Sequence, residues 1–242
     1  MSVTPQTTSN GWSPREIWTS YVTGPLAGAL AVIPVFYGFE AKIDQQLGKK
    51  IRPMNMKNSL IEGCKAAPII GIQMAVQNVV EKYLMKKFQD DPKQPPSFAA
   101  MLASALFVGL ISTPPLAIFN GKAMGQTPMQ SLKALSRWQT GAIVARETSF
   151  LFSLRIIDPI QKVMKRTFGD NKAVEYGSAF IGGGIGSLIG HPADTALTLW
   201  QKEMKIESLS QTMRGAPVKA LTVAVFAVLY KMTENGLKPP SR

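Results

Sequence analysis

One pattern of small residues and proline recurs three times along this 242-residue chain and restricts its fold more than any other feature. Each copy reads small residue, three residues, Gly, five residues, Pro. The copies are Gly24-x3-Gly28-x5-Pro34, Ala105-x3-Gly109-x5-Pro115 and Gly182-x3-Gly186-x5-Pro192. The prolines are 81 and 77 residues apart. Recurrence at a near-constant period indicates three copies of one supersecondary unit.

The small residues and the proline in each copy are typical of membrane helices. Small residues four apart let helix backbones approach closely in lipid. A proline late in a span kinks the helix, so its end turns across the bundle axis. A second landmark follows each proline: Gly63, Gly141 and Gly215, each soon followed by a base. These glycines open the second helix of each expected hairpin.

Six stretches are long and apolar enough to be spans or deeply buried helices: 17–39, 64–85, 98–119, 141–163, 174–200 and 217–232. The sequence therefore predicts an all-α protein of six transmembrane helices in three pseudo-threefold repeats. A polar tail, 1–16, precedes repeats over 17–96, 97–172 and 173–242. Arg146 and Glu147 lie within the fourth stretch, where charges usually face a bundle interior or a wet cavity.

Charge and composition narrow the ligand classes. The formal net charge of +12 suits nucleic acid, an anionic membrane surface or an anionic solute. The basic residues are spread between apolar segments, so we expect no nucleic-acid partner. One Cys and one His, Cys64 and His191, exclude an intrachain disulfide and a Cys/His metal cluster. Gly182–Gly184 is similar to a dinucleotide-binding loop but lacks the preceding strand of that motif, so we expect no dinucleotide there. We also expect no metal, no other cofactor and no enzymatic activity.

The repeat resembles the mitochondrial carrier family, solute transporters built from three repeats of two helices. The family signature is Pro-x-[Asp/Glu]-x-x-[Lys/Arg] at the end of each odd helix, with a Gln further on. Pro192-Ala193-Asp194 fits it, and Gln201 lies nine residues after the proline. Lys219, with Tyr230 eleven residues later, is similar to the family's even helices. The resemblance implies a multi-pass protein of the mitochondrial inner membrane whose partners are lipid and a small-molecule solute.

The chain departs from the family at its gate charges. In the family, acidic and basic signature residues form a ring of ion pairs that closes the cavity. Here Asp194 is the one acidic member, because Phe36 and Ala117 occupy the other acidic positions. The basic positions hold Phe39, Asn120 and Leu197. We therefore expect no ring of ion pairs among the signature positions, and Pro34, Pro115, Pro192, Asp194, Gln201 and Tyr230 remain the candidate gate or signature residues.

The resemblance also implies which residues bind solute: Lys65, Arg146 with Glu147, and Lys219, one position on each even helix. Three cations and one carboxylate favour a carboxylate or an amino acid. Alternatively, Lys65 and Lys219 lie near helix ends and extend to the membrane interface. The small residues Gly24, Gly28, Gly109, Gly182 and Gly186 are expected to pack helices together.

Three functional interpretations remain open on the sequence. The first is a transporter of a small anionic or zwitterionic metabolite across the mitochondrial inner membrane. The second is a carrier-derived structural subunit that no longer transports and packs against other membrane protein subunits; the missing gate charges favour it. The third is a water-soluble helical protein with buried repeats.

Overall fold

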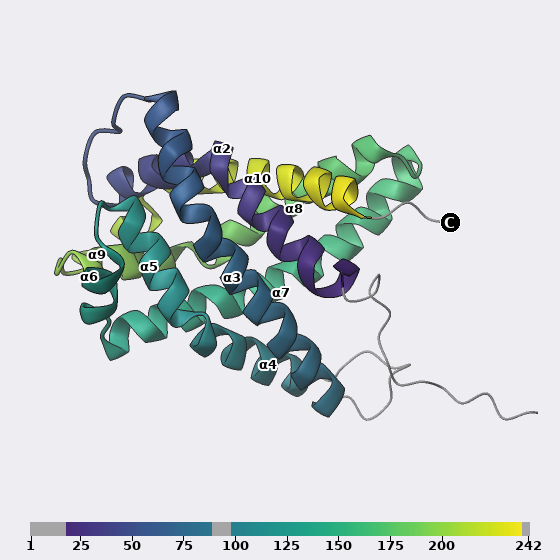
Figure 1. Ribbon diagram of the computed structural model, residues 1–242, viewed down its shortest axis with the longest axis horizontal. Coiled ribbons are helices and arrows are strands. Elements are labelled where there is room, and N and C mark those ends of the chain that lie inside the picture. The colour runs from purple at the N-terminus through teal and green to yellow at the C-terminus, as the bar shows by residue number, and fades with distance from the viewer. Residues whose placement is uncertain (1–17, 89–97, 239–242) are drawn as a thin grey trace, which may run out of the picture.

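The computed structural model describes residues 18–88 and 98–238, and every regular element within these ranges is a helix (Figure 1). The expected polar tail, 1–16, lies outside the described residues. In chain order the elements are η1 (Trp18–Val22), α2 (Thr23–Gln46), α3 (Met56–Phe88), α4 (Phe98–Ile111), α5 (Thr113–Ala123), α6 (Pro128–Lys133), α7 (Arg137–Phe168), α8 (Lys172–Ile189), α9 (His191–Gln201), η2 (Ser210–Met213) and α10 (Ala216–Leu237).

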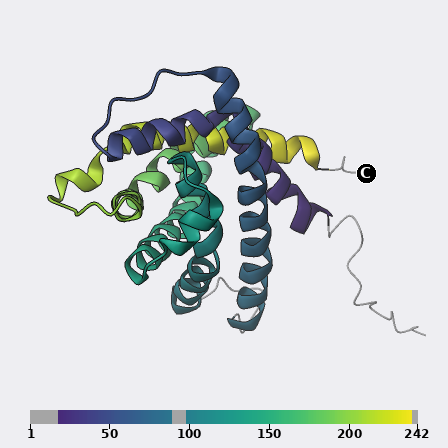
Figure 2. The ribbon, with the colours of Figure 1, turned by 60° about the vertical axis from the view of Figure 1, so that its left-hand side comes forward.

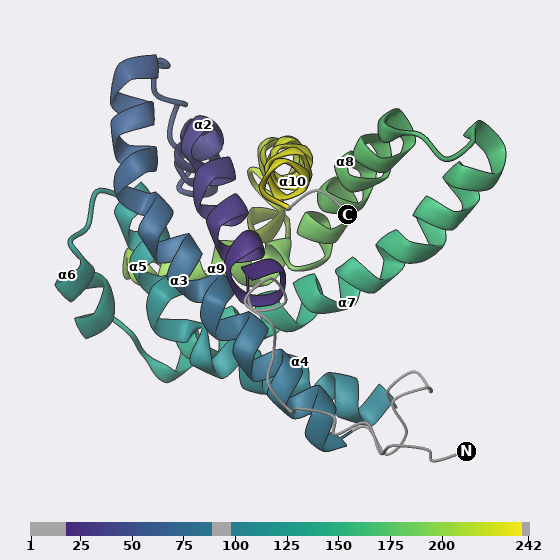
Figure 3. The same cartoon turned by 45° about the vertical axis from the view of Figure 1, so that its right-hand side comes forward.

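The longest helices contact one another in a closed cycle. The packed pairs are α2 with α3, α3 with α4, α4 with α7, α7 with α8, α8 with α10, and α10 with α2. Figure 3 shows α10 almost end-on between α2 and α8. The first and last long helices are therefore neighbours, and the cycle surrounds a common interior.

Two of the three recurring prolines follow a helix break, and the third does not. The pair α4 and α5 is bent by 57° at Ser112, just before Pro114 and Pro115. Likewise α8 ends before Gly190, and α9 begins with Pro192 in its first turn. Proline suits a first turn, where its missing N–H is not needed. Pro34 instead lies inside the uninterrupted helix α2, so the expected kink does not break the helix there.

Glycines bring several helices close together. A Cβ added at Gly28 would meet the Met74 side chain on α3, and one at Gly109 would lie 3.1 Å from the Val144 Cα atom on α7. A Cβ at Gly24 would lie 3.2 Å from the Tyr230 hydroxyl. In α8, Gly183 faces α10, where an added Cβ would lie 3.0 Å from the Val223 carbonyl oxygen. Gly182 is buried, and Gly186 lines the interior cavity.

Three helices within the described ranges are long and apolar enough to cross a membrane: Thr23–Gln46, Met56–Val80 and Ser210–Leu237. The bent pair α4–α5 makes a fourth if it counts as one span. Neither α7 nor the pair α8–α9 is apolar enough to count as a membrane span by this measure, because α7 carries internal charges and α8 is rich in glycine. The outer face of α8 is nevertheless apolar, with Phe180, Ile181 and Ile185 exposed. The apolar helices are compatible with a membrane-embedded protein.

The connections that follow α2, α5 and α9 gather at one end of the molecule (Figure 1). α5, α6 and α9 lie together there (Figure 1), and η2 contacts both α2 and α9. The connections after α2 and after α9 run outside the helical body (Figure 2). The ends of α2, α5 and α9 converge at this end, which we call the convergent end.

Candidate functional site: a buried charge cluster in a helix-lined cavity

The interior of the helix cycle contains a cavity of about 180 Å³. Its walls are mainly apolar, with Ile70, Met74 and Phe226 among them. Its charged lining residues, within the described part of the chain, are Lys42, Arg146, Glu147, Asp194 and Lys219. They come from α2, α7, α9 and α10, so the cavity holds charges from widely separated segments.

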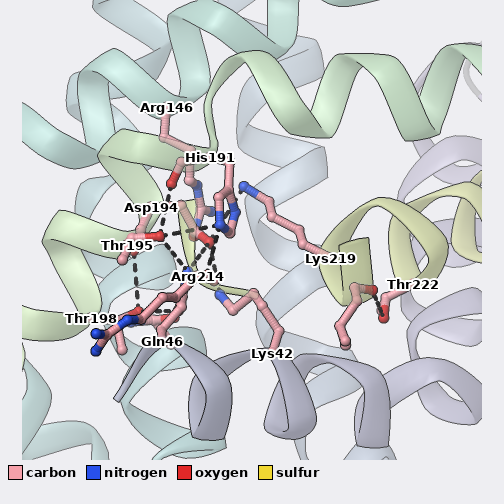
Figure 4. Close-up of polar contacts among 12 residues, drawn as sticks. Lys42, Gln46, Arg146, His191, Asp194, Thr195, Thr198, Arg214, Lys219 and Thr222 are labelled. Atoms are coloured by element: carbon pink, nitrogen blue, oxygen red, sulfur yellow. Dashed lines mark hydrogen bonds and ion pairs between the residues drawn. The ribbon is translucent and has the colours of Figure 1, made fainter. Parts of the chain in front are cut away.

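Asp194 is the centre of this charge cluster. Its side chain is 1% exposed, and three cations point toward it (Figure 4). The Lys42 Nζ atom lies 2.8 Å from Oδ2, the Lys219 Nζ atom lies 3.3 Å from Oδ2, and Arg146 donates from Nη1 to Oδ1 at 2.9 Å. A buried carboxylate requires such compensation, because desolvation of an unpaired charge costs several kcal/mol.

The backbone places these groups within reach of one another. A Cβ added at Gly190, in the break before α9, would lie 3.1 Å from the Arg146 carbonyl oxygen, so the start of α9 sits directly against α7. Gly215 has a left-handed backbone with φ of +79° at the start of α10. A Cβ there would lie 2.9 Å from the Lys42 carbonyl oxygen, so α10 begins against the end of α2. Both approaches need glycine, and both bring a cation toward Asp194.

A network of uncharged groups continues from the cluster toward the convergent end. Gln46 donates from Nε2 to Asp194 Oδ2 at 3.2 Å and to the Thr195 hydroxyl at 2.9 Å. The Thr198 hydroxyl donates to Gln46 Oε1 at 2.8 Å. His191, on the same helix, lies 2.9 Å through Nε2 from the Arg214 carbonyl oxygen. These bonds fix α9 against α2 and the chain before α10.

The positions of the family's gate charges make different contacts in this chain. Phe36 and Phe39 on α2 pack edge-on against Phe119 on α5, with ring centroids 6.0 and 5.3 Å apart. Asn120 donates to Gln201 Oε1 at 2.6 Å, and Gln201 donates to the Ala117 carbonyl oxygen at 3.2 Å. At these positions the chain therefore has aromatic packing and amide hydrogen bonds, and the ion pairs gather at Asp194, the one signature position that keeps its charge.

A second polar group extends along the cavity wall from Arg146. Arg146 Nε donates to Glu147 Oε1 at 3.2 Å, and Gln77 donates to Glu147 Oε2 at 2.9 Å. Gln77 also donates to the Ser112 hydroxyl, at 3.0 Å, in the break between α4 and α5. Gln73, one turn earlier on α3, is 7% exposed and lines the cavity. Its Oε1 atom has no hydrogen-bond partner within the described part of the chain.

The structure brings together four of the charged residues singled out from the sequence: Arg146, Glu147, Asp194 and Lys219. It places Lys65 elsewhere. The Lys65 side chain is 58% exposed and pairs with Glu62, so it is not part of the cavity lining, contrary to the expectation that it binds solute there. Tyr230 lies outside the lining as well, stacked on Phe226.

Sequence reasoning missed Lys42, Gln46, Gln73 and Gln77. Lys42 falls beyond the expected end of the first apolar stretch, because α2 continues to Gln46. The signal that points to Lys42 is Asp194 itself: a carboxylate within an apolar segment needs a base, and no signature position supplies one.

No protein-family model matches this sequence, and no curated protein matches it. Function must therefore be argued from the geometry of the charge cluster and its cavity.

Proposed function

We propose that this protein is a transporter of a small anionic or zwitterionic metabolite, built as a six-helix carrier of three hairpins in the mitochondrial inner membrane. The observation that carries the proposal is the charge cluster: Lys42, Arg146 and Lys219 meet around one carboxylate in a cavity inside the helix cycle. Cations held in a low-dielectric interior attract anions strongly. A bundle that served packing alone would gain more from apolar residues there.

Two features support the six-helix, three-hairpin arrangement. The long helices contact one another in sequence order and the last returns to the first. The recurring prolines lie in the first, third and fifth apolar stretches, within α2, α5 and α9, which are the helices whose ends meet at the convergent end. The mitochondrial location rests on the resemblance of the sequence to the carrier family.

Uptake into reconstituted vesicles tests transport. Vesicles that contain the purified chain should accumulate a labelled monocarboxylate or amino acid, and Arg146→Gln should abolish uptake, because Arg146 contacts both carboxylates in the cavity. Arg166→Gln is the matched control on the same helix, since Arg166 is exposed. Absence of uptake for every carboxylate and amino acid, or equal rates for wild type and Arg146→Gln, would reject the proposal.

A second candidate function is a non-transporting structural subunit of a mitochondrial membrane complex. The packing at the convergent end favours it, because Phe36, Phe39 and Asn120 occupy positions where the family has gate charges, and they make aromatic contacts and an amide hydrogen bond there instead. Purification in mild detergent separates the two candidates. A structural subunit should elute in a stable complex of fixed stoichiometry, whereas a transporter should elute alone and bind solute.

A further inference from the structure

The charge balance of the cavity determines the net charge of the solute that fits it. Its charged lining residues, within the described ranges, are three cations and two carboxylates: Lys42, Arg146, Lys219, Asp194 and Glu147. Counted as formal charges, they leave one positive charge uncompensated. An uncompensated buried charge is costly, so a ligand that restores neutrality binds better than one that adds a net charge of either sign. The balance therefore favours a solute of net charge −1.

The cluster already shows which anion it holds. Arg146 and the two lysines contact both oxygens of the Asp194 carboxylate at 2.8–3.3 Å. A carboxylate is thus compatible with the directions in which these donors point. Guanidinium and ammonium groups retain further N–H donors, because Arg has five and Lys has three. A second carboxylate, from the solute, can use the remaining donors beside Asp194.

The unpaired amide oxygen identifies a second group on the solute. Gln73 Oε1 is buried, lines the cavity and has no partner within the described part of the chain. Buried acceptors are normally paired, so this atom marks a place for a donor. Gln77 lies one turn away on the same face of α3 and holds Glu147. Gln73 and Gln77 therefore line the same wall of the cavity.

The size of the cavity admits a small organic solute. A cavity of about 150 Å³ holds benzene, which has six heavy atoms. The cavity of about 180 Å³ in this protein is thus large enough for a solute of similar size.

We propose that the cavity binds a small monocarboxylate of net charge −1 with a hydrogen-bond donor beside the carboxylate, as in a 2-hydroxy acid. The carboxylate contacts Arg146 and Lys219, and the hydroxyl donates to Gln73 Oε1. The proposal deepens the proposed transport function, but binding is measured separately from transport.

A matched series of three-carbon ligands tests the proposal on the full chain purified in detergent. Propanoate lacks the donor, L-lactate has it, L-alanine is a zwitterion, and malonate carries two charges. L-lactate should bind with a Kd about two- to tenfold lower than propanoate, the effect of one hydrogen bond. L-alanine and malonate should bind more weakly than L-lactate. Equal Kd values for L-lactate and propanoate, or tighter binding of malonate or L-alanine, would overturn the proposal.

Two variants and one control locate the contacts. Gln73→Met should remove the preference for L-lactate, so that the ratio of the Kd values for propanoate and L-lactate falls to about one. Glu147→Gln leaves two uncompensated positive charges, so it should shift the preference toward malonate. Lys65→Gln, outside the cavity, should change nothing. A Gln73→Met protein that keeps the preference for L-lactate contradicts the assigned contact. If a variant does not fold, the wild-type series decides by itself.

Uptake of L-lactate into vesicles separates this inference from the proposed function. Selective binding of L-lactate, together with no uptake of any carboxylate or amino acid, supports the inference and rejects transport. Uptake of a different anion, together with no binding of L-lactate, rejects the inference but supports the transport proposal.

Discussion

At the scale of single residues, Asp194 determines the charge arrangement of the interior. We predict that Asp194→Asn lowers the stability of the protein, because it leaves Lys42 and Lys219 buried without their carboxylate. Loss of one partner of a buried pair costs about 3–5 kcal/mol. Thermal unfolding in detergent measures the effect, and Asp170→Asn is the control, since Asp170 is exposed in a surface pair with Lys165.

The double variant Lys42→Gln with Asp194→Asn makes this prediction specific. Removal of one cation together with the carboxylate leaves less uncompensated charge, so the double variant should be more stable than Asp194→Asn alone. Additive losses from the two substitutions would show that Lys42 and Asp194 do not interact.

Residue patterns predicted part of the site and failed where helix rotation and helix length decide. On α3, Ile70, Gln73, Met74 and Gln77 line the cavity at helical spacing. Lys65 lies five residues before Ile70, a rotation of about 140°, so it faces away from them. Lys42 was missed because α2 runs past the apolar stretch, and its contact with Asp194 spans 152 residues. Neither fact can be read from local spacing.

At the scale of elements, glycines set where helices meet. We predict that Gly215→Ala destabilises the protein more than Gly125→Ala. Both glycines have a φ of +79°, so alanine is strained at both by about 1–2 kcal/mol. At Gly215 the added Cβ would also lie 2.9 Å from the Lys42 carbonyl oxygen, whereas at Gly125 it would meet no atom within 4 Å. The difference between the melting temperatures of the two variants measures the effect of that contact. Equal melting temperatures would contradict the prediction.

The apolar content of the sequence predicted where the helices lie, whereas it did not predict where a helix breaks. Over the described residues the six apolar stretches fall on helices, but 98–119 and 174–200 each cover two helices separated by a break. The prolines marked breaks before α5 and α9, where they occupy a first turn. Pro34 has the same sequence frame, yet α2 passes through it. Unlike Pro115 and Pro192, Pro34 has no helix break before it, although α2 packs against both α3 and α10, and the sequence frame alone does not distinguish the three prolines.

At the scale of the whole molecule, the six-helix proposal requires α8 and α9 to cross the membrane together, although glycine and charge make them less apolar than the other spans. In a Cys64→Ser background, Asp170→Cys and Ser208→Cys place single thiols just before α8 and after α9, both at exposed positions. An impermeant maleimide added to sealed vesicles of one orientation should label one thiol and leave the other protected until detergent opens the vesicles. Labelling of both from the same side means that α8–α9 enters and returns, because a continuous crossing puts its two ends in different compartments. That result would remove the enclosed pathway on which the transport proposal depends, since the wall between α7 and α10 is formed by α8.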